Sequence, residues 1–246
     1  MLTPTLQDRL QVRERPDQSP VMFQRWSNLL FAHWEADPAL VQNRLPRGLH
    51  VDTHEGRTYL GLVPFFMEKV RARFLPTVPW LSNFLELNVR CYVHDNQGRP
   101  GVWFFSLDCN QPVAVELARR FFHLPYEHAR MRSNRGIYHC QRKTEKDKAS
   151  YQWDAKEGGQ EAEPGSLEFF LLERYLLFSA SPKGTLKSGR VHHPPYRFHQ
   201  LPVEPVDPTP LKWNDFAVSG PPISLLASPG VDVEVFPLKD NSPLTP

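Results

Sequence analysis

The chain has 246 residues, of which 40% are hydrophobic and 23% charged, and it contains 16 Phe and 6 Trp. This composition is typical of a folded globular protein and excludes extensive disorder. The formal charge is +2 and the Lys and Arg residues are scattered, so no nucleic-acid partner is expected. No run of about 18 apolar residues is present, and the first 20 residues lack the apolar centre of a signal peptide. We therefore expect a cytoplasmic protein without a membrane partner.

The three cysteines, Cys91, Cys109 and Cys140, are widely spaced, and no CxxC or paired histidine motif accompanies them. An odd number with such spacing is not typical of a disulfide framework or of a zinc site. We interpret them as buried thiols and expect neither a metal nor a cofactor. The 25 prolines argue against a mostly helical protein, because proline is tolerated mainly in loops and at the ends of elements.

The length suits a single domain, since mainly-β domains reach this size. No internal repeat of fixed period divides the sequence. We expect a flexible N-terminal segment at residues 1–21, one domain at residues 22–238 and a tail at residues 239–246.

The first predicted element is a strand over residues 26–35, whose two faces are both largely apolar, as in a strand covered on both sides. Residues 37–45 predict a short helix with an aspartate N-cap and a proline in the first turn. Residues 57–71 form the next predicted strand, in which Pro64 indicates a bulge or an edge position. The proline-broken, aromatic segment at residues 71–83 is predicted to be a loop, either a lid beside a pocket or a covering of the core.

The most informative stretch runs from Phe84 to Tyr126. It predicts a strand, a hairpin turn, a second strand and a helix, over residues 84–94, 95–101, 102–108 and 112–122. Side chains of the first strand alternate between its two faces. One face is apolar, and the other carries a polar row that is the best candidate site in the sequence: Glu86, Asn88, Arg90 and Tyr92.

The second half of the chain predicts fewer regular elements. Residues 131–143 and 150–156 read as a charged hairpin. Residues 167–179 predict a helix that is apolar around more than half of its circumference and therefore nearly buried. Residues 201–213 are proline-rich and irregular. In residues 231–236 valines alternate with acids, which predicts a half-buried strand.

Four motifs in this order resemble the uncharacterised YqjF-type family, also called DUF2071: residues 84–93, 167–178, 191–195 and 228–235. The resemblance covers roughly residues 22–238. That family in turn resembles acetoacetate decarboxylases in fold. The resemblance implies an α+β, mainly-β protein with a closed antiparallel β-barrel, a few helices packed outside it and a central cavity.

Residues 107–125 are similar to the decarboxylase stretch that leads to the catalytic lysine. In those enzymes this lysine, activated by an adjacent lysine, forms a Schiff base with the substrate ketone. The resemblance places Tyr126 and Glu127 at the corresponding positions, so the lysine pair is absent. Acetoacetate decarboxylase activity is therefore not expected.

An inward-facing polar row would divide the work of acid-base catalysis. Arg90 could bind a carboxylate or enolate, Glu86 could transfer a proton, and Tyr126 could donate a hydrogen bond to a carbonyl oxygen. The same alternation also fits a solvent face or a salt-bridge ladder between strands. Neighbouring His192 and His193 point to opposite sides of a strand, so at most one could enter a common site. The candidate substrate-binding residues are Asn88, Tyr92, Phe105 and His192.

Two functions of different class remain open. The first is a lyase- or isomerase-type enzyme that acts by acid-base catalysis on a small carbonyl or carboxylate compound, without a metal and without a Schiff base. The second is a non-enzymatic protein that binds an apolar or aromatic ligand among residues such as Trp26, Phe65, Phe105 and Tyr126. A structural interaction protein with a filled interior is a third alternative. The expected partner is a small molecule, and a homo-oligomer is left open.

Overall fold

The computed structural model describes residues 2–241. The helices in this range are α1 (Leu6–Arg13), α2 (Pro38–Gln42), α3 (Pro79–Ser82), α4 (Pro112–Phe122), α5 (Leu167–Leu172) and α6 (Thr209–Lys212). The strands are β1 (Met22–Ala36), β2 (Leu49–Val51), β3 (Thr58–Ala72), β4 (Phe84–Asp95), β5 (Pro100–Cys109), β6 (Tyr126–Asn134), β7 (Ile137–Arg142), β8 (Ala149–Gln152), β9 (Leu176–Ala180), β10 (Leu186–His192), β11 (His199–Gln200), β12 (Ser224–Val235) and β13 (Lys239–Asp240). The protein has a mainly-β α+β fold, as expected. No helix within residues 2–241 is long and apolar enough to cross a membrane.

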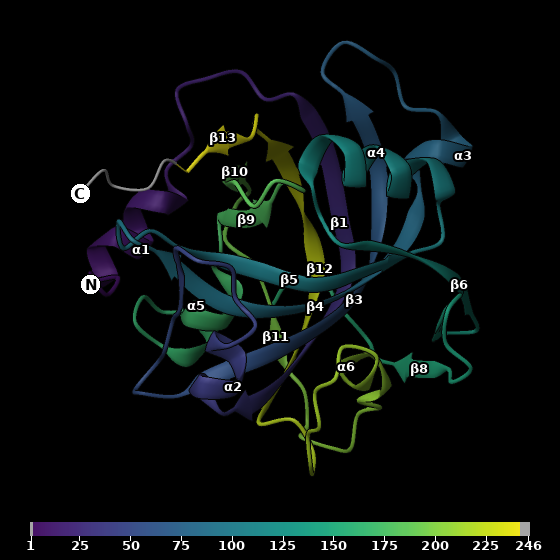
Figure 1. Cartoon of the computed structure of the whole chain (residues 1–246). Coiled ribbons are helices and arrows are strands. Elements are labelled where there is room, and N and C mark those ends of the chain that lie inside the picture. The colour runs from purple at the N-terminus through teal and green to yellow at the C-terminus, as the bar shows by residue number, and fades with distance from the viewer. Residues whose placement is uncertain (1, 242–246) are drawn as a thin grey trace.

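The strand pairings form a ring (Figure 1). Each strand in the order β4, β3, β1, β12, β10, β9 and β5 pairs with the next, and β5 pairs back with β4. All of these pairs are antiparallel except β5 with β9, which is parallel. The expectation of an entirely antiparallel arrangement is therefore wrong at this pair. Local alternation cannot reveal strand direction, because it is the same in both kinds of sheet.

A bulge interrupts the pairing of β1 with β3, where Pro64 predicts one. The register shifts between Ser27 and Ala32 of β1, and Asn28 adopts a positive φ of 47°. Pro64 lies opposite this interruption, and because proline has no N–H, the break costs no hydrogen bond on its side. The bulge allows two long strands to bend around the interior of the ring.

The two faces of β4 have different surroundings. Its apolar face packs against an outer layer formed by β6, β7, β8 and α6, in a cluster that includes Leu87, Val89, Met131, Cys140 and Leu211. Its polar face points into the ring. Helix α4 and the β3–β4 segment lie at one end of the ring, at the upper right of Figure 1.

The helix predicted over residues 167–179 is wrong in its second half. Helix α5 ends at Leu172, and strand β9 begins at Leu176. Glu173 leaves the helical conformation with φ −84° and ψ 80°, and its carboxylate accepts hydrogen bonds from the backbone N–H of Tyr196 at 3.0 Å and from the hydroxyl of Tyr175. An apolar run cannot by itself distinguish a buried helix from a buried strand. A buried charged side chain needs hydrogen-bond partners. The break after Leu172 lets Glu173 reach Tyr175 and Tyr196, and it lets Arg174 reach Asp52.

The N-terminal segment expected to be flexible contains helix α1. Thr5 caps it, with a reciprocal hydrogen bond from Asp8 back to the cap. Arg9 of this helix donates to both carboxylate oxygens of buried Asp52, at 2.6 and 2.7 Å. Asp52 also accepts from Arg174 at 2.8 Å. Two arginines from distant parts of the sequence therefore share one buried carboxylate.

Candidate functional site

A cavity of about 410 Å³ lies inside the ring. Strands β1, β3, β4 and β5 contribute most of its wall, while α4 and the β3–β4 segment cover one end. Most of the lining side chains are apolar. The charged or amide side chains among them are Gln24, Arg71, Glu86, Asn88, Arg90 and Arg174.

The polar face of β4 provides a row across this cavity. Glu86, Asn88 and Arg90 all line it, as expected for side chains two residues apart on one strand. The Cα atoms of Glu86 and Arg90 are roughly 13 Å apart along the strand, at about 3.3 Å per residue. No ion pair joins the two side chains, within the part of the chain that the structure describes. The row therefore presents a carboxyl group and a cation to the same cavity, and the two do not form an ion pair with each other.

Glu86 is almost fully buried, and among residues 2–241 its carboxyl group accepts one hydrogen bond, from the hydroxyl of Tyr126 at 2.7 Å from Oε2. Burial raises the pKa of Glu86 to about 7, and nearby Asp108 adds to the rise while the Tyr126 hydrogen bond opposes it. Burial also raises the pKa of Tyr126 well above its ordinary value, with nearby Glu86 contributing. Near neutral pH the carboxyl group can therefore both give and take a proton, whereas the phenol keeps its own.

The guanidinium group of Arg90 is hydrogen-bonded through one nitrogen but not through another. Its Nη2 donates to the carbonyl oxygen of Leu171 at 3.1 Å and to the hydroxyl of Tyr92 at 3.4 Å. Its Nε has no hydrogen-bond partner among residues 2–241, and the same holds for Oδ1 of Asn88. Buried polar atoms are almost always hydrogen-bonded, so these two atoms are unusual in having no partner.

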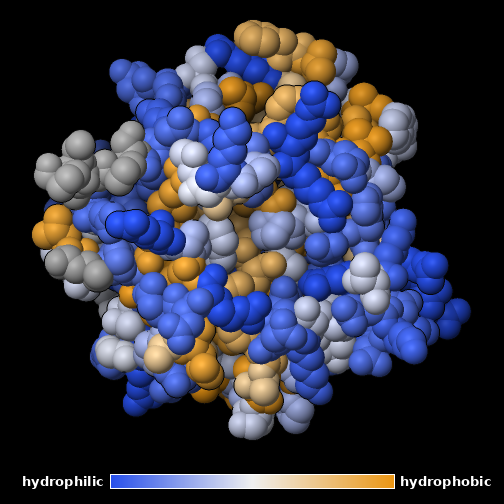
Figure 2. Space-filling view, in the orientation of Figure 1, coloured by the Kyte–Doolittle hydropathy of each residue, from blue (hydrophilic) through white to orange (hydrophobic). Residues whose placement is uncertain are grey.

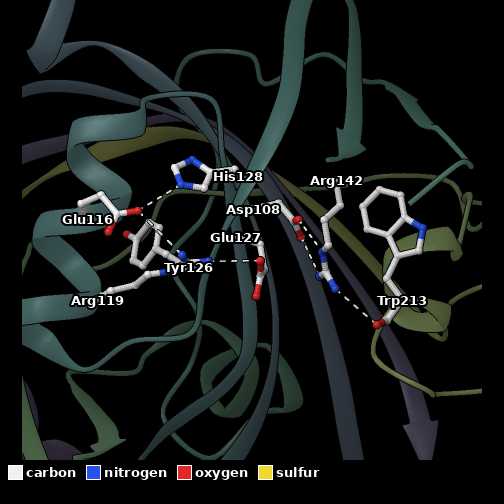
Figure 3. A network of polar contacts seen from close by, with 8 residues as sticks. All are labelled: Asp108, Glu116, Arg119, Tyr126, Glu127, His128, Arg142 and Trp213. Atoms are coloured by element: carbon white, nitrogen blue, oxygen red, sulfur yellow. Dashed lines mark hydrogen bonds and ion pairs between the residues drawn. The ribbon is translucent and has the colours of Figure 1, made fainter. Parts of the chain in front are cut away.

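A polar network on the outside of the ring fixes the strand that carries Tyr126 (Figure 3). Arg119 of α4 donates to the backbone carbonyl of Tyr126 at 2.7 Å and to the carboxylate of Glu127 at 3.2 Å. Beside it, buried Asp108 accepts two hydrogen bonds from Arg142, at 2.8 and 3.0 Å. The Arg119 contacts anchor the beginning of β6 to α4, and the Asp108–Arg142 pair ties β7 to β5. Because β6 begins beside β5, with Tyr126 opposite Leu107, these contacts help to set the position of the phenol over Glu86.

Three of the predicted site residues lie elsewhere. Tyr92 is buried behind the wall, where its hydroxyl donates to the Leu171 carbonyl at 3.0 Å and lies 2.8 Å from Nε2 of His33. Phe105 points to the opposite face of β5 and packs on Phe216 at 4.7 Å between ring centroids. His192 borders a separate surface groove. The structure therefore brings together Glu86, Asn88, Arg90 and Tyr126, and leaves Tyr92, Phe105 and His192 outside the cavity.

Sequence reasoning missed several residues of the cavity wall. Arg174 lines it from the end of α5, and Tyr196 from an irregular segment. A charged residue inside an apolar run was the available signal for Arg174, because such a residue needs a partner. Tyr196 had no local signal. Within residues 2–241, no group of three or more His, Cys, Asp or Glu side chains is placed to hold a metal ion.

The fold is similar to known structures of decarboxylase type. Acetoacetate decarboxylase from Legionella pneumophila has a TM-score of 0.62 and 11% identity, over 98% of this chain and 96% of that one. The enduracididine biosynthesis enzyme MppR, in its complex with pyruvate, has a TM-score of 0.59 and 12% identity, over 94% and 95% of the two chains. At these identities the likeness concerns the fold alone.

Sequence relatives define the family. The uncharacterized protein YqjF of Bacillus subtilis (strain 168) is 37% identical over 194 residues, which make up 77% of this chain and 79% of YqjF. The profile of DUF2071, described as uncharacterized conserved proteins, matches residues 23–232. The resemblance expected from the four motifs is confirmed: the chain belongs to the DUF2071 family.

Proposed function

We propose that residues 22–238 form a single barrel domain whose cavity binds a small carbonyl or carboxylate compound, and that Glu86 transfers a proton to or from this compound. The observation that carries the proposal is the buried pair of Glu86 and Tyr126 in an apolar cavity that Arg90 shares. A carboxyl group with a pKa near 7 is suited to acid-base catalysis at neutral pH. MppR binds pyruvate in a protein of similar fold, which supports this class of ligand.

The polar groups would have separate roles. Arg90 would bind the negative charge of the ligand through its unpaired Nε–H, and Asn88 would accept a hydrogen bond from a hydroxyl or amide group. Tyr126 donates its hydroxyl proton to Glu86, so it acts as a positioning residue for this carboxyl group rather than as a donor to a carbonyl oxygen. No lysine pair adjoins Tyr126, and the proposed mechanism has no Schiff base.

The spacing of the row constrains the ligand. An acidic group at Arg90 and a reacting carbon at Glu86 must bridge side chains whose Cα atoms lie roughly 13 Å apart. The cavity volume of about 410 Å³ is in the range of small-molecule sites. We therefore favour compounds with an apolar body between the carboxylate and the reacting carbonyl over a three-carbon keto acid.

A non-enzymatic binding protein is the second candidate. The lining outside the polar row is mostly apolar, and Trp26 and Phe65 belong to it. Such a wall stabilises an apolar or aromatic ligand whether or not a reaction follows.

The test is a thermal-shift and native mass spectrometry screen against keto acids, enols and aromatic carboxylates. A ligand of the cavity should lose at least about tenfold in affinity in Arg90→Ala, because a charge-assisted hydrogen bond is lost. Stability should change little, since the hydroxyl of Tyr92 still donates to the Leu171 carbonyl. Arg57→Ala, at an exposed arginine, is the matched control.

Proton transfer is then measured as deuterium incorporation beside the carbonyl of the bound compound in D₂O. Glu86→Gln should keep the binding and abolish the exchange. If the wild-type protein binds the compound without deuterium exchange, the proposed enzymatic function is refuted and the non-enzymatic binding function is supported. Ligands that bind equally well to Arg90→Ala would place the site outside the polar row.

A further inference from the structure

Exposed apolar side chains border the end of the cavity that α4 and the β3–β4 segment cover. We call them the apolar rim: Phe74, Leu75, Trp80, Val113, Leu117 and Phe121. Phe74 is 86% exposed and Trp80 66%. Figure 2 shows hydrophobic side chains gathered in the upper part of the view, where Figure 1 places α3 and α4. A cluster of large exposed apolar side chains beside a cavity is typical of an interaction surface.

A hydrogen bond connects the two segments that carry the apolar rim, and two rim side chains also line the cavity. Val113, Leu117 and Phe121 are four residues apart and therefore lie along one side of α4. The side chain of Gln111 donates to the backbone carbonyl of Trp80 at 2.7 Å, which ties α3 to the start of α4. Leu75 and Leu117 are exposed and also line the cavity, so the cavity reaches the surface within the rim.

Cations outnumber acids around the apolar rim. Residues 69–83 contain Lys69, Arg71 and Arg73 and no acid. The guanidinium groups of Arg73 and Arg120 lie over the rings of their neighbours in sequence, at 5.0 and 5.8 Å from the centroids. The one acidic residue of α4, Glu116, is paired with other side chains. Arg119 is paired with Glu116 and Glu127, whereas Arg73 and Arg120 form no ion pair within residues 2–241. The rim thus combines aromatic groups with unpaired cations.

We propose that the apolar rim docks on the surface of an anionic phospholipid bilayer. Aromatic side chains are stable at the boundary between headgroups and acyl chains, and neighbouring arginines are attracted to anionic headgroups. A second copy of the chain fits less well, because a twofold contact would place each cluster of cations against its own copy. This proposal departs from the sequence-based expectation of no membrane partner. That expectation rested on the absence of an apolar run long enough to span a bilayer, and a surface contact needs no such run.

Docking would turn the mouth of the cavity toward the acyl chains. An apolar ligand could then pass between bilayer and cavity without crossing water, which removes the cost of hydrating its apolar surface. The inference goes beyond the proposed function, and it is tested without any turnover or cavity ligand.

The experiment is flotation of the purified protein with vesicles of phosphatidylcholine alone and with vesicles that also contain phosphatidylglycerol. The wild-type protein should float with the phosphatidylglycerol vesicles at low salt and less at high salt. Phe74→Ser/Trp80→Ser should weaken this binding at least about tenfold, because two apolar anchors are removed. Arg73→Glu/Arg120→Glu should weaken it similarly, and only on the anionic vesicles.

Leu40→Ser is the matched control, since Leu40 is 63% exposed on α2, at the lower left of Figure 1 and away from the apolar rim. Thermal unfolding at the same temperature as wild type shows that a variant is folded. If a double variant does not fold, its two single substitutions are tested instead. Absence of wild-type binding, or unchanged binding in Phe74→Ser/Trp80→Ser, would overturn the proposal. So would a dimer in light scattering that the same double variant dissociates, because the rim would then be an interface between copies.

Discussion

The ionisation of the Glu86 carboxyl group affects the stability of the fold. Its pKa is about 7 in the folded protein and near 4.5 when exposed, so the folded state binds more protons in the interval between these values. Its contribution to stability is therefore fully present below about pH 4.5 and is lost as the pH rises through about 7. At about 1.36 kcal/mol per pH unit, the loss between pH 5 and pH 8 is about 2 to 3 kcal/mol.

We predict that Glu86→Gln removes this pH dependence. Glutamine still accepts the hydrogen bond from Tyr126 but does not ionise, so the variant should gain about 2 to 3 kcal/mol relative to wild type between pH 5 and pH 8. Urea unfolding at several pH values measures the difference. Glu163→Gln, at an exposed glutamate, should follow wild type. Parallel pH profiles for wild type and Glu86→Gln would show that the carboxyl group ionises as freely in the cavity as in water.

For single residues, the alternation along β4 predicted which side chains share a face of the strand but not which face points into the ring. Glu86, Asn88 and Arg90 entered the cavity together because the strand period is two residues. Tyr92 follows the same alternation but lies behind the wall, where Leu171 and His33 occupy its hydroxyl. Phe105 was misplaced because the β4–β5 register shifts between Val89 and Arg90, and a bulge changes which side chains face inward.

At the scale of elements, helix α1 is held to the rest of the fold by an ion pair with the carboxylate of Asp52. Asp52 is fully buried and pairs with the partly accessible Arg9 and with the buried Arg174. Asp52→Asn would leave the guanidinium of Arg174 buried without a counter-charge. We predict a loss of about 3–5 kcal/mol in the free energy of unfolding.

Arg9→Ala should cost less, about 1–2 kcal/mol, because Arg174 keeps its carboxylate and only hydrogen bonds from a partly accessible arginine are lost. Urea unfolding measures both variants. Arg15→Ala, which breaks an exposed pair with Glu234, should change stability little. Equal losses in Asp52→Asn and Arg9→Ala would mean that Arg174 does not depend on Asp52.

Elements with a strong local signal were predicted well. Strands β1, β3, β4 and β5 lie close to their predicted ranges, and α4 begins and ends at the predicted residues, whereas β12 begins seven residues before the strand predicted at residues 231–236. Helix α1 and the division between α5 and β9 were not predicted. Both depend on partners remote in sequence, since Arg9 meets Asp52 and Arg174 meets the same carboxylate only in the folded protein.

At the scale of the whole molecule, the cavity of about 410 Å³ limits the size of any compound that could bind inside the ring. Ala118 lines the cavity from α4 and is partly exposed. We predict that Ala118→Trp weakens binding of the anionic aromatic probe 1-anilinonaphthalene-8-sulfonate at least about tenfold, because the indole occupies the same space. The free energy of unfolding should change by less than about 1 kcal/mol, since a partly exposed position can accommodate the ring.

Fluorescence titration of the probe checks this prediction. Val113→Trp is the control, because Val113 lies on the same helix but does not line the cavity. Similar losses of binding in both variants would mean that the probe binds on the outer side of α4. Unchanged binding in both would place the probe away from this end of the cavity.

The ring of strands also sets the order in which a growing polypeptide can fold. β1 pairs with β12, so residues near 30 remain without one neighbour until residues near 227 have been made. At typical rates of about 5–20 residues per second, the ribosome needs on the order of 10–40 s to synthesise the intervening chain. During that time the apolar wall of the future cavity is open to water. We expect chaperone binding and aggregation during synthesis to depend on when β12 becomes available to pair with β1. We also expect folding to be slow, because the contacts between β1 and β12 are so distant in sequence.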